Sequence, residues 1–276
     1  MQHGVLVTLA YDGGAFSGWQ EQPGQRTVQA ALAAAAARIA RHAVKVRGAA
    51  RTDAGVHAEG QIAAFGTERA LSARRWNLAL NRYLPDDVAV RLVEPCAPEY
   101  DPRFDAVDKM YRYLFHLGVV RDPLTRGRAW HLGRLLQHEL VQVERLDGAR
   151  PRLDLAAMRR AAAVLEGTHD FRAFRSADDA RENTTRTLHR VALEGDYGGD
   201  PSVLALEVTG DAFLKNMVRI LAGTLVEVGR GRFGAERVAA LLGADGDRRH
   251  AGITAPAHGL TLVRVRLGRS RAPASR

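Results

Sequence analysis

The chain has 276 residues, of which 46% are hydrophobic and 26% are charged, proportions that exclude a disordered chain and indicate a globular one. Lys and Arg number 40 against 31 Asp and Glu, and the net charge of +9 favours a polyanionic partner such as nucleic acid, although a GC-rich genome also enriches arginine. The single cysteine, Cys96, excludes an intrachain disulfide and a cysteine-built metal site, and the lack of a membrane-length apolar run or a signal peptide predicts a cytoplasmic protein.

The first part of the chain predicts elements in the order β-α-β-β-α-β. A strand over Val5 to Ala10 closes on the turn YDGG, and Thr27 then caps a helix with apolar residues at helical spacing. Two strands follow, VKVRGA and QIAAF, on either side of a polar loop. Ser72 caps a second helix that ends before Pro85, and VAVRLVE is the closing strand.

The second part of the chain repeats this order. The alternating YRYLFHL predicts a strand, and Asp154 caps a helix that Gly167 stops. The segments RTLHRVALE and VLALEVT predict a hairpin, because a turn rich in Gly and Asp separates them. An amphipathic helix is expected from Phe213 to Val228, and LTLVRVRL is the last strand.

Each half therefore has the split βαβ order, which predicts an α/β (α+β) fold. A half of this type leaves one face of its sheet free, as in RNA-recognition domains, and two halves can join their sheets around a central cleft. We expect the first half at 1–105 and the second at 106–268, with a basic insertion near 121–152 and a disordered tail at 269–276.

Two motifs resemble known sites but lack the required context. The segment GRGRFG matches a dinucleotide-binding pattern, yet it follows a helix rather than a strand. The segment HELVQ has Gln142 where a zinc-protease helix needs its second histidine. No phosphate-binding P-loop or hydrolase nucleophile motif is present, so the sequence does not support these enzyme classes.

The loop from Arg51 to Gln61, RTDAGVHAEGQ, is the strongest candidate for a site. Asp and Gly are ordinary turn residues, so a solvated surface turn is one interpretation. An active-site loop is the other, with Asp53 as nucleophile, general base or metal ligand. A metal site would need companion carboxylates, and only Glu59 is near. Because Arg51 favours the ionised form of Asp53, the pattern suits a nucleophile or a group that stabilises positive charge.

The same loop closely resembles the catalytic signature of the tRNA pseudouridine synthase A family. Further segments resemble that family in the same order along residues 5–267. They are YDGGAFSGWQEQPGQRTVQ, LNRYLPDDVAV, KMYRYLF, HDFRAF, FLKNMVRILAGTLVEVGRG and TAPAHGLTLVRV. The chain is identified on these segments as a member of the family.

The resemblance implies two ferredoxin-like halves that share a central cleft. It further implies isomerisation of uridine to pseudouridine at positions 38 to 40 in the anticodon stem-loop of tRNA, without a cofactor or a metal, by a homodimer in which one tRNA contacts both subunits. Asp53 corresponds to the family's catalytic aspartate, which attacks either C6 of the base or C1′ of the ribose.

Four other residues are candidates for a part in this reaction. Tyr111 matches the tyrosine that packs on the target base and is a candidate for proton abstraction, although Tyr113 lies on the same face of the strand. Arg219 matches the basic residue that pairs with the aspartate. A planar guanidinium such as Arg51 can fill the gap left by an extruded uridine. Leu214 is expected to line the base pocket, and ordinary core packing is its alternative.

Two other functions remain open at this stage. One is an RNA-binding protein of the same fold without catalysis, which predicts loss of Asp53, Tyr111 or Arg219, and all three are intact. The other is a glycosidase-type hydrolase that uses Asp53 with Glu59 as a carboxylate pair. The sequence departs from the family pattern at Ala50, Gly14 and Thr261 and in the length of the stretch 128–153. None of these departures falls on Asp53, Tyr111 or Arg219.

Overall fold

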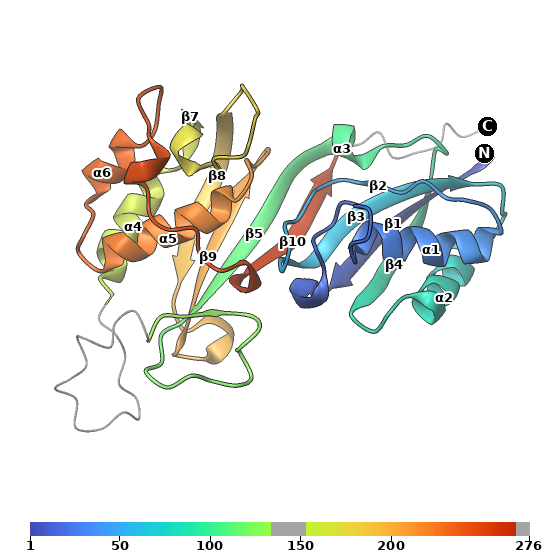
Figure 1. Ribbon diagram of the computed structural model, residues 1–276, viewed down its shortest axis with the longest axis horizontal. Helices are drawn as coiled ribbons and strands as arrows, with labels where there is room; N and C mark the ends of the chain where they lie inside the picture. Colours follow the sequence, from blue (N-terminus) through green and yellow to red (C-terminus); the bar gives the residue numbers. More distant parts are fainter. Residues whose placement is uncertain (134–152, 269–276) are drawn as a thin grey trace. The chain divides into compact units, whose positions relative to one another are not determined.

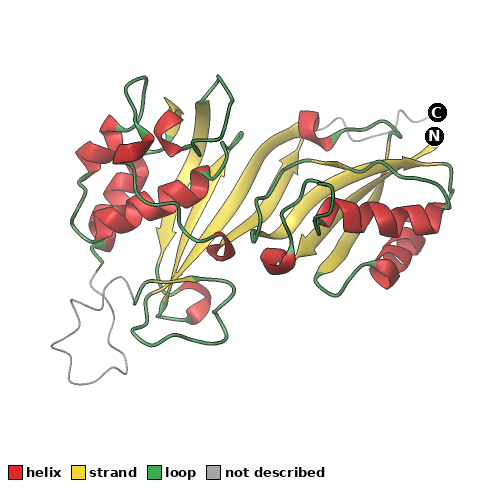
Figure 2. Ribbon diagram, in the orientation of Figure 1, coloured by secondary structure: helices red, strands yellow, loops and turns green. Residues whose placement is uncertain are grey.

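The computed structural model describes residues 1–133 and 153–268 and has a mixed α/β fold (Figures 1 and 2), which confirms the predicted class. Two compact units are present: the first combines Met1–Lys109 with the described residues 261–268, and the second is Met110–Leu260. The last strand therefore groups with the first unit, whereas the sequence places it in the second half. The predicted tail at 269–276 and the part of the insertion at 134–152 lie outside the described residues.

The sheet of the first unit runs in the order β4, β1, β3, β10. Strand β1 pairs antiparallel with β3 and β4, whereas β10 pairs parallel with β3, so the arrangement of strands is mixed. Parallel strands need a long crossover, and the whole second unit supplies it here. The bounds are β1 His3–Tyr11, β2 Arg47–Gly48, β3 His57–Thr67, β4 Val88–Cys96 and β10 Leu260–Leu267.

Helices α1 (Val28–Ala40) and α2 (Ala73–Tyr83) contact each other beside this sheet (Figure 1). Both predicted caps are confirmed, because the hydroxyl of Thr27 accepts from the Ala30 amide and that of Ser72 from the Arg75 amide. Leu32 of α1 and Trp76 and Leu80 of α2 are at most 2% exposed and form core. The predicted strand VKVRGA is shorter than expected, since only the two residues of β2 pair with β3.

The sheet of the second unit contains β5, β9, β8 and β7 in that order. Strand β8 pairs antiparallel with β7 and β9, which confirms the predicted hairpin, and β6 pairs parallel with β5. The strand bounds are β5 Ala106–His116, β6 Trp130–His131, β7 Gly167–Asp170, β8 Thr185–Glu194 and β9 Val203–Gly210. Strand β5 begins in the first unit and continues from Met110 in the second.

Helix α4 (Leu155–Val164) contacts α5 (Met217–Gly229), α6 (Ala235–Ala240) and β8. The carboxylate of Asp154 caps α4 as predicted. Strand β7 and helix α6 were not predicted, because four- and six-residue elements carry little periodicity. The remaining helical turns are α3 Pro102–Asp105, η1 Gly13–Ala15, η3 Arg172–Phe174, η4 Tyr197–Gly199, η5 Arg248–His250 and η6 Ala257–Gly259.

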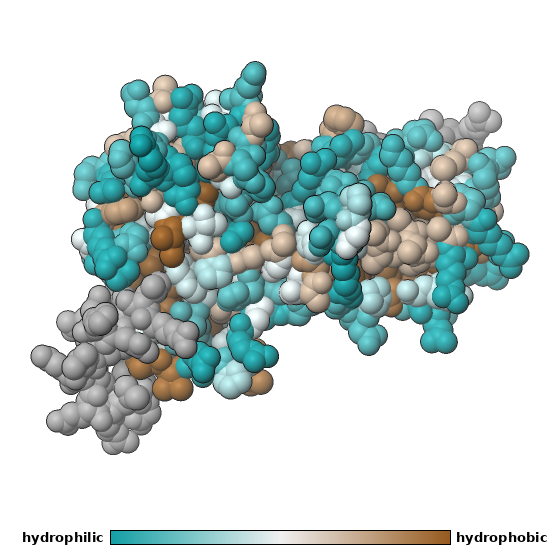
Figure 3. All heavy atoms as spheres, in the orientation of Figure 1, coloured by the Kyte–Doolittle hydropathy of each residue, from teal (hydrophilic) through white to brown (hydrophobic). Residues whose placement is uncertain are grey.

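Helix α5 differs from its prediction in start and in burial. It begins at Met217 rather than at Phe213, and eleven of its residues are buried, so it is a core helix instead of an amphipathic one. Among the described residues, no helix has the length and apolar character needed to cross a membrane. Polar side chains cover most of the face seen in Figure 3.

Candidate active site

Asp53 lies in the loop that leads into β3, in the first unit. Asp53 is half-buried, Arg51 is exposed, and Thr52 between them is 7% exposed. The amide of Val56 donates to the Asp53 carbonyl over 3.1 Å and closes a tight turn, and the Gly55 amide donates to Phe16 O over 3.2 Å. The loop thus presents one carboxylate and one guanidinium from a backbone that is itself hydrogen-bonded.

A second segment, residues 11–19, holds this loop at several points. The hydroxyls of Tyr11 and Thr52 are 2.7 Å apart and share a buried hydrogen bond. The Trp19 amide donates to Thr52 O over 3.0 Å, and the Gly13 amide donates to Nδ1 of His57 over 3.0 Å. The chain is therefore fixed both before and after Asp53. We call residues 11–19 the brace.

Two glycines of the brace allow this close approach. A Cβ on Gly13 would collide with the carbonyl of Val56, on the far side of the turn. Gly18 has a φ of 96°, and a Cβ there would lie 2.7 Å from Thr52 O. Neither position accepts a side chain without displacing the loop.

The start of the loop is bonded to strand β3. Gln61 is fully buried, and its Nε2 donates to Ala50 O over 2.8 Å while its Oε1 accepts from the Ala50 amide over 3.3 Å. Sequence reasoning did not identify Gln61, Tyr11 or His57 as parts of the site, because these bonds join residues 11 to 44 positions apart. The only available signal was their occurrence within the two segments that resemble the family.

Tyr111 lies on β5 in the second unit. It is 6% exposed, and its ring meets that of Phe213 edge-on, with centroids 4.9 Å apart. Tyr113 is fully buried, and its hydroxyl donates to Pro256 O over 2.8 Å. Burial raises the pKa of Tyr113, while the charge of Arg219 acts in the opposite direction. The hydroxyl of Tyr113 thus bonds to backbone, and the choice of Tyr111 for chemistry stays a prediction.

Arg219 is the third residue of α5, and two hydrogen bonds orient its guanidinium. Its Nε donates to Ala255 O over 2.7 Å, and Nη1 donates to Oδ1 of Asn216 over 2.6 Å. The Ala255 amide donates in return to Arg219 O over 3.1 Å. Asn216 has a φ of 61°, an uncommon conformation for a residue other than glycine. This backbone directs its amide side chain to the guanidinium.

Leu214 is 4% exposed and lies just before α5. The segment that carries it is held by Asp179, whose carboxylate accepts from the Lys215 amide over 2.9 Å and from the guanidinium of Arg181. Hydrogen bonding to Arg181 lowers the pKa of Asp179, so its carboxylate stays ionised. The burial of Leu214 suits core packing as well as a base pocket, and the pocket stays a prediction.

The structure places the predicted residues in two groups, one in each unit. Arg51 and Asp53 share one braced loop, and Tyr111 contacts Phe213, the neighbour of Leu214. Arg219 lies one turn further along the same segment, close enough to Tyr113 to affect its pKa. The predicted pairing of Asp53 with Arg219 and the predicted cleft both stay predictions.

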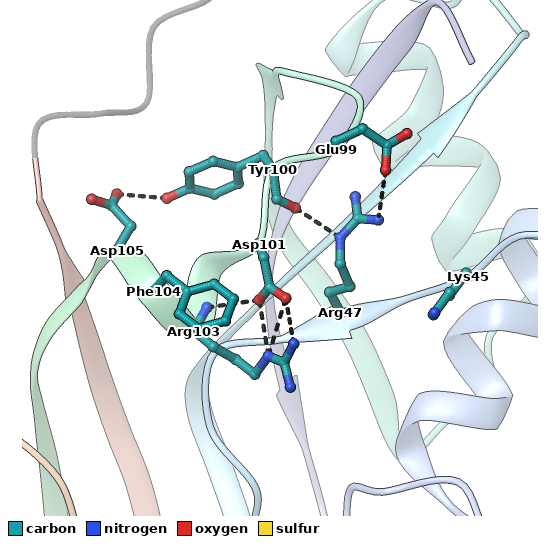
Figure 4. Close-up of a pocket in the computed structure, with 8 residues that line it drawn as sticks. All are labelled: Lys45, Arg47, Glu99, Tyr100, Asp101, Arg103, Phe104 and Asp105. Carbon is teal, nitrogen blue, oxygen red and sulfur yellow. Dashed lines mark hydrogen bonds and ion pairs between the residues drawn. The ribbon is translucent and has the colours of Figure 1, made fainter.

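A hollow elsewhere in the first unit is a weaker candidate (Figure 4). Several of its polar groups bond to one another or to backbone: Arg103 pairs with Asp101, Arg47 donates to Tyr100 O, and the Tyr100 hydroxyl donates to Asp105. These bonds use the groups that would otherwise recognise a ligand. The hollow contains no residue of the Asp53 loop.

Comparison with known proteins gives one consistent result. A family model described as tRNA pseudouridine synthase matches residues 8–105 and 161–267. A tRNA pseudouridine synthase A from Pelobacter propionicus is 42% identical over 261 residues, which cover 95% of this chain and 98% of the relative. Proteins of the same name from Geobacter sulfurreducens and Geobacillus kaustophilus are 42% and 40% identical, over 95% and 96% of this chain and 98% and 95% of their own length.

Proposed function

We propose that this chain, which belongs to the tRNA pseudouridine synthase family, isomerises uridine to pseudouridine in the anticodon stem-loop of tRNA, at positions 38 to 40. The observation that carries the proposal is the setting of Asp53. Its carboxylate stands on a loop whose backbone is hydrogen-bonded on both sides, within residues 8–105, which the family model matches. A fixed carboxylate of this kind suits a nucleophile.

The proposed reaction is an intramolecular transfer. Asp53 adds through one carboxylate oxygen to C6 of the uracil or to C1′ of the ribose, and the bond between N1 and C1′ breaks. The uracil rotates, and a new bond forms between C5 and C1′. A base removes the proton from C5, N1 gains a proton, and the carboxylate is released. Atoms and electrons balance without an oxidant, so no cofactor is proposed.

The other residues have supporting roles in this proposal. Arg219 pairs with Asp53 and orients its carboxylate, because a fixed positive charge attracts the carboxylate oxygens. Tyr111 packs on the target base and is the candidate for proton removal from C5. Arg51 fills the gap that the extruded uridine leaves in the base stack, and it binds a phosphate. Leu214 contributes apolar surface to the base pocket. The enzyme is further proposed to be a cytoplasmic homodimer.

The test uses tRNA labelled with tritium at C5 of uracil. Pseudouridine formation must expel this hydrogen, so the wild type should release tritium. Asp53→Asn should release none while it still binds tRNA, because an amide cannot add as a carboxylate does. Asp86→Asn, at an exposed acid on another loop, is the matched control and should react as the wild type does.

The rival functions give different outcomes in the same assay. A protein that only binds RNA would release no tritium even as the wild type. A glycosidase-type hydrolase would yield free uracil and an abasic site. Tritium release that persists in Asp53→Asn would remove the proposed nucleophile.

A further inference from the structure

Three buried side chains around the Asp53 loop have no part in the proposed reaction. They are Tyr11 in the brace, Thr52 directly before Asp53, and His57 at the start of β3, and they are 4%, 7% and 1% exposed. Each takes part in a hydrogen bond between the loop and the brace. Their common location on both sides of one carboxylate calls for a functional explanation.

We infer that Tyr11, Thr52 and His57 are positioning residues, which hold the Asp53 carboxylate where it can reach the target nucleotide. The inference rests on the proposed function, because it assumes that Asp53 is the reacting group. It goes beyond that proposal by assigning a role in the reaction rate to residues that do not touch the substrate.

Thr52 is bonded at two of its atoms. Its hydroxyl lies 2.7 Å from the Tyr11 hydroxyl, and its carbonyl accepts from the Trp19 amide over 3.0 Å. These bonds fix both the side chain and the peptide plane at residue 52, and the next residue is Asp53. The direction in which Asp53 leaves the backbone is therefore set by Thr52. Burial raises the pKa of Tyr11, so the phenol stays protonated at neutral pH.

His57 fixes the other side of the turn. Its Nδ1 accepts from the Gly13 amide over 3.0 Å, and an imidazole that accepts at Nδ1 carries its proton at Nε2 when neutral. The carboxylate of Asp12 lies 3.1 Å from the same nitrogen, with which it pairs only when the ring is protonated, and it accepts from the Gly14 amide over 2.9 Å. The ring thus connects the first residue of β3 to the tight turn of the brace.

The hydrogen bonds of Tyr11, Thr52 and His57 affect the position of the Asp53 carboxylate more than the stability of the fold. Strand β3 is held by its ladder with β1, which runs from His3↔Thr67 to Tyr11↔Ala58 and does not depend on the side chain of Thr52 or His57. A displacement of about 1 Å in a reacting group can slow a reaction about 100-fold. Loss of one brace bond should therefore lower the rate of the chemical step while tRNA binding is unchanged.

The experiment measures single-turnover tritium release and tRNA affinity for Tyr11→Phe and Thr52→Val. We expect each to slow the reaction by about tenfold to 100-fold with the dissociation constant for tRNA unchanged. Tyr100→Phe is the matched control: it removes a tyrosine hydroxyl that donates to Asp105 over 2.6 Å in the same unit, and it should react at the wild-type rate. The double variant should be no slower than the slower single variant, because both changes remove one shared bond.

Conservative variants separate positioning from folding. Thr52→Ser keeps the hydroxyl and should restore most of the rate that Thr52→Val loses. His57→Asn keeps an acceptor near the place of Nδ1 and should react faster than His57→Leu. Equal rates for Tyr11→Phe and Tyr100→Phe, or a Thr52→Ser variant as slow as Thr52→Val, would overturn the inference.

Asp53→Asn, measured alongside, distinguishes the two proposals. If it is active, the nucleophile assignment fails. If it is inactive while Tyr11→Phe reacts at the wild-type rate, the nucleophile stands and only the positioning role fails.

Discussion

The loop around Asp53 and the start of α5 around Arg219 each fix one charged side chain, but they do so in different ways. At Arg219 hydrogen bonds reach the guanidinium itself, from Ala255 O and Asn216 Oδ1. At Asp53 hydrogen bonds hold the residues and backbone on either side of it, at Thr52, Gly55 and His57. A cation can be held directly by neutral acceptors without losing its charge, whereas a nucleophile needs its oxygens available for the substrate.

This difference has a consequence for mutagenesis. The position of Asp53 should depend on residues that lie far from it in the sequence, and small changes in the brace should alter the reaction. The position of Arg219 should depend on the few groups that bond to its own side chain.

The largest effect is expected from Gly18→Ala in the brace. The new Cβ would lie 2.7 Å from Thr52 O at a φ of 96°, so both strain and collision oppose it. We expect a loss of stability on the order of 3 kcal/mol and a tritium-release rate below detection. Thermal unfolding and the release assay measure both quantities.

Gly24→Ala is the control for this change. Gly24 also has a positive φ, of 71°, but a Cβ there meets nothing within 4 Å. It should cost only about 1 kcal/mol and leave the rate unchanged. Equal losses of activity in the two variants would contradict the specific role of the brace.

The second effect concerns Arg219 and its partner. Asn216→Gly keeps the left-handed backbone at φ 61° but removes the amide that bonds to Nη1. A hydrogen bond to a charged group contributes about 1.5 to 3 kcal/mol, so we expect the rate to fall by roughly tenfold to 100-fold. Asn216→Asp keeps an acceptor and should retain more of the rate than Asn216→Gly in the same assay.

The third effect is a pH dependence of stability at Asp179. Arg181 lowers the pKa of this carboxyl in the folded state, so its contribution is present at neutral pH and is lost as the pH falls below about 4. Asp179→Asn should therefore melt at a lower temperature than the wild type at pH 7. The difference should narrow in acid, and scanning calorimetry between pH 7 and pH 3 would measure it. A gap that widens in acid would contradict this assignment.

The smallest effect is expected from Tyr113→Phe. The change removes the hydroxyl that donates to Pro256 O over 2.8 Å and leaves the carbonyl without that partner. We expect a loss of about 1 kcal/mol in unfolding free energy, measured by denaturant titration, with little change in rate. A complete loss of tritium release in Tyr113→Phe, with Tyr111→Phe active, would exchange the roles of the two tyrosines.

Local features of the fold were predictable from the sequence. The caps at Thr27, Ser72 and Asp154 depend on a side chain and an amide three residues away, so the sequence contains the whole interaction. The start of α5 was not predictable in this way. Bonds from Asp179 and Arg181 fix the segment before Met217, and they come from more than 30 positions upstream.

The site was only partly predictable for the same reason. The polar loop and its turn residues identified the region of Asp53, but spacing alone left nucleophile, base and metal ligand open, and resemblance to the family selected among them. The bonds of Tyr11 to Thr52 and of Gly13 to His57 span 41 and 44 positions and carry no local pattern. The register of β1 on β3, which pairs Tyr11 with Ala58, brings the two segments together.

The most direct test of the account is the single-turnover rate of Asp53→Glu. This variant keeps a carboxylate and its charge but moves the oxygens by one methylene, so it changes position alone. If the brace sets the reactive position of Asp53, tritium release should slow by about 100-fold or more while tRNA binds as tightly as to the wild type. Release close to the wild-type rate would contradict the claim that this carboxylate reacts from one fixed place.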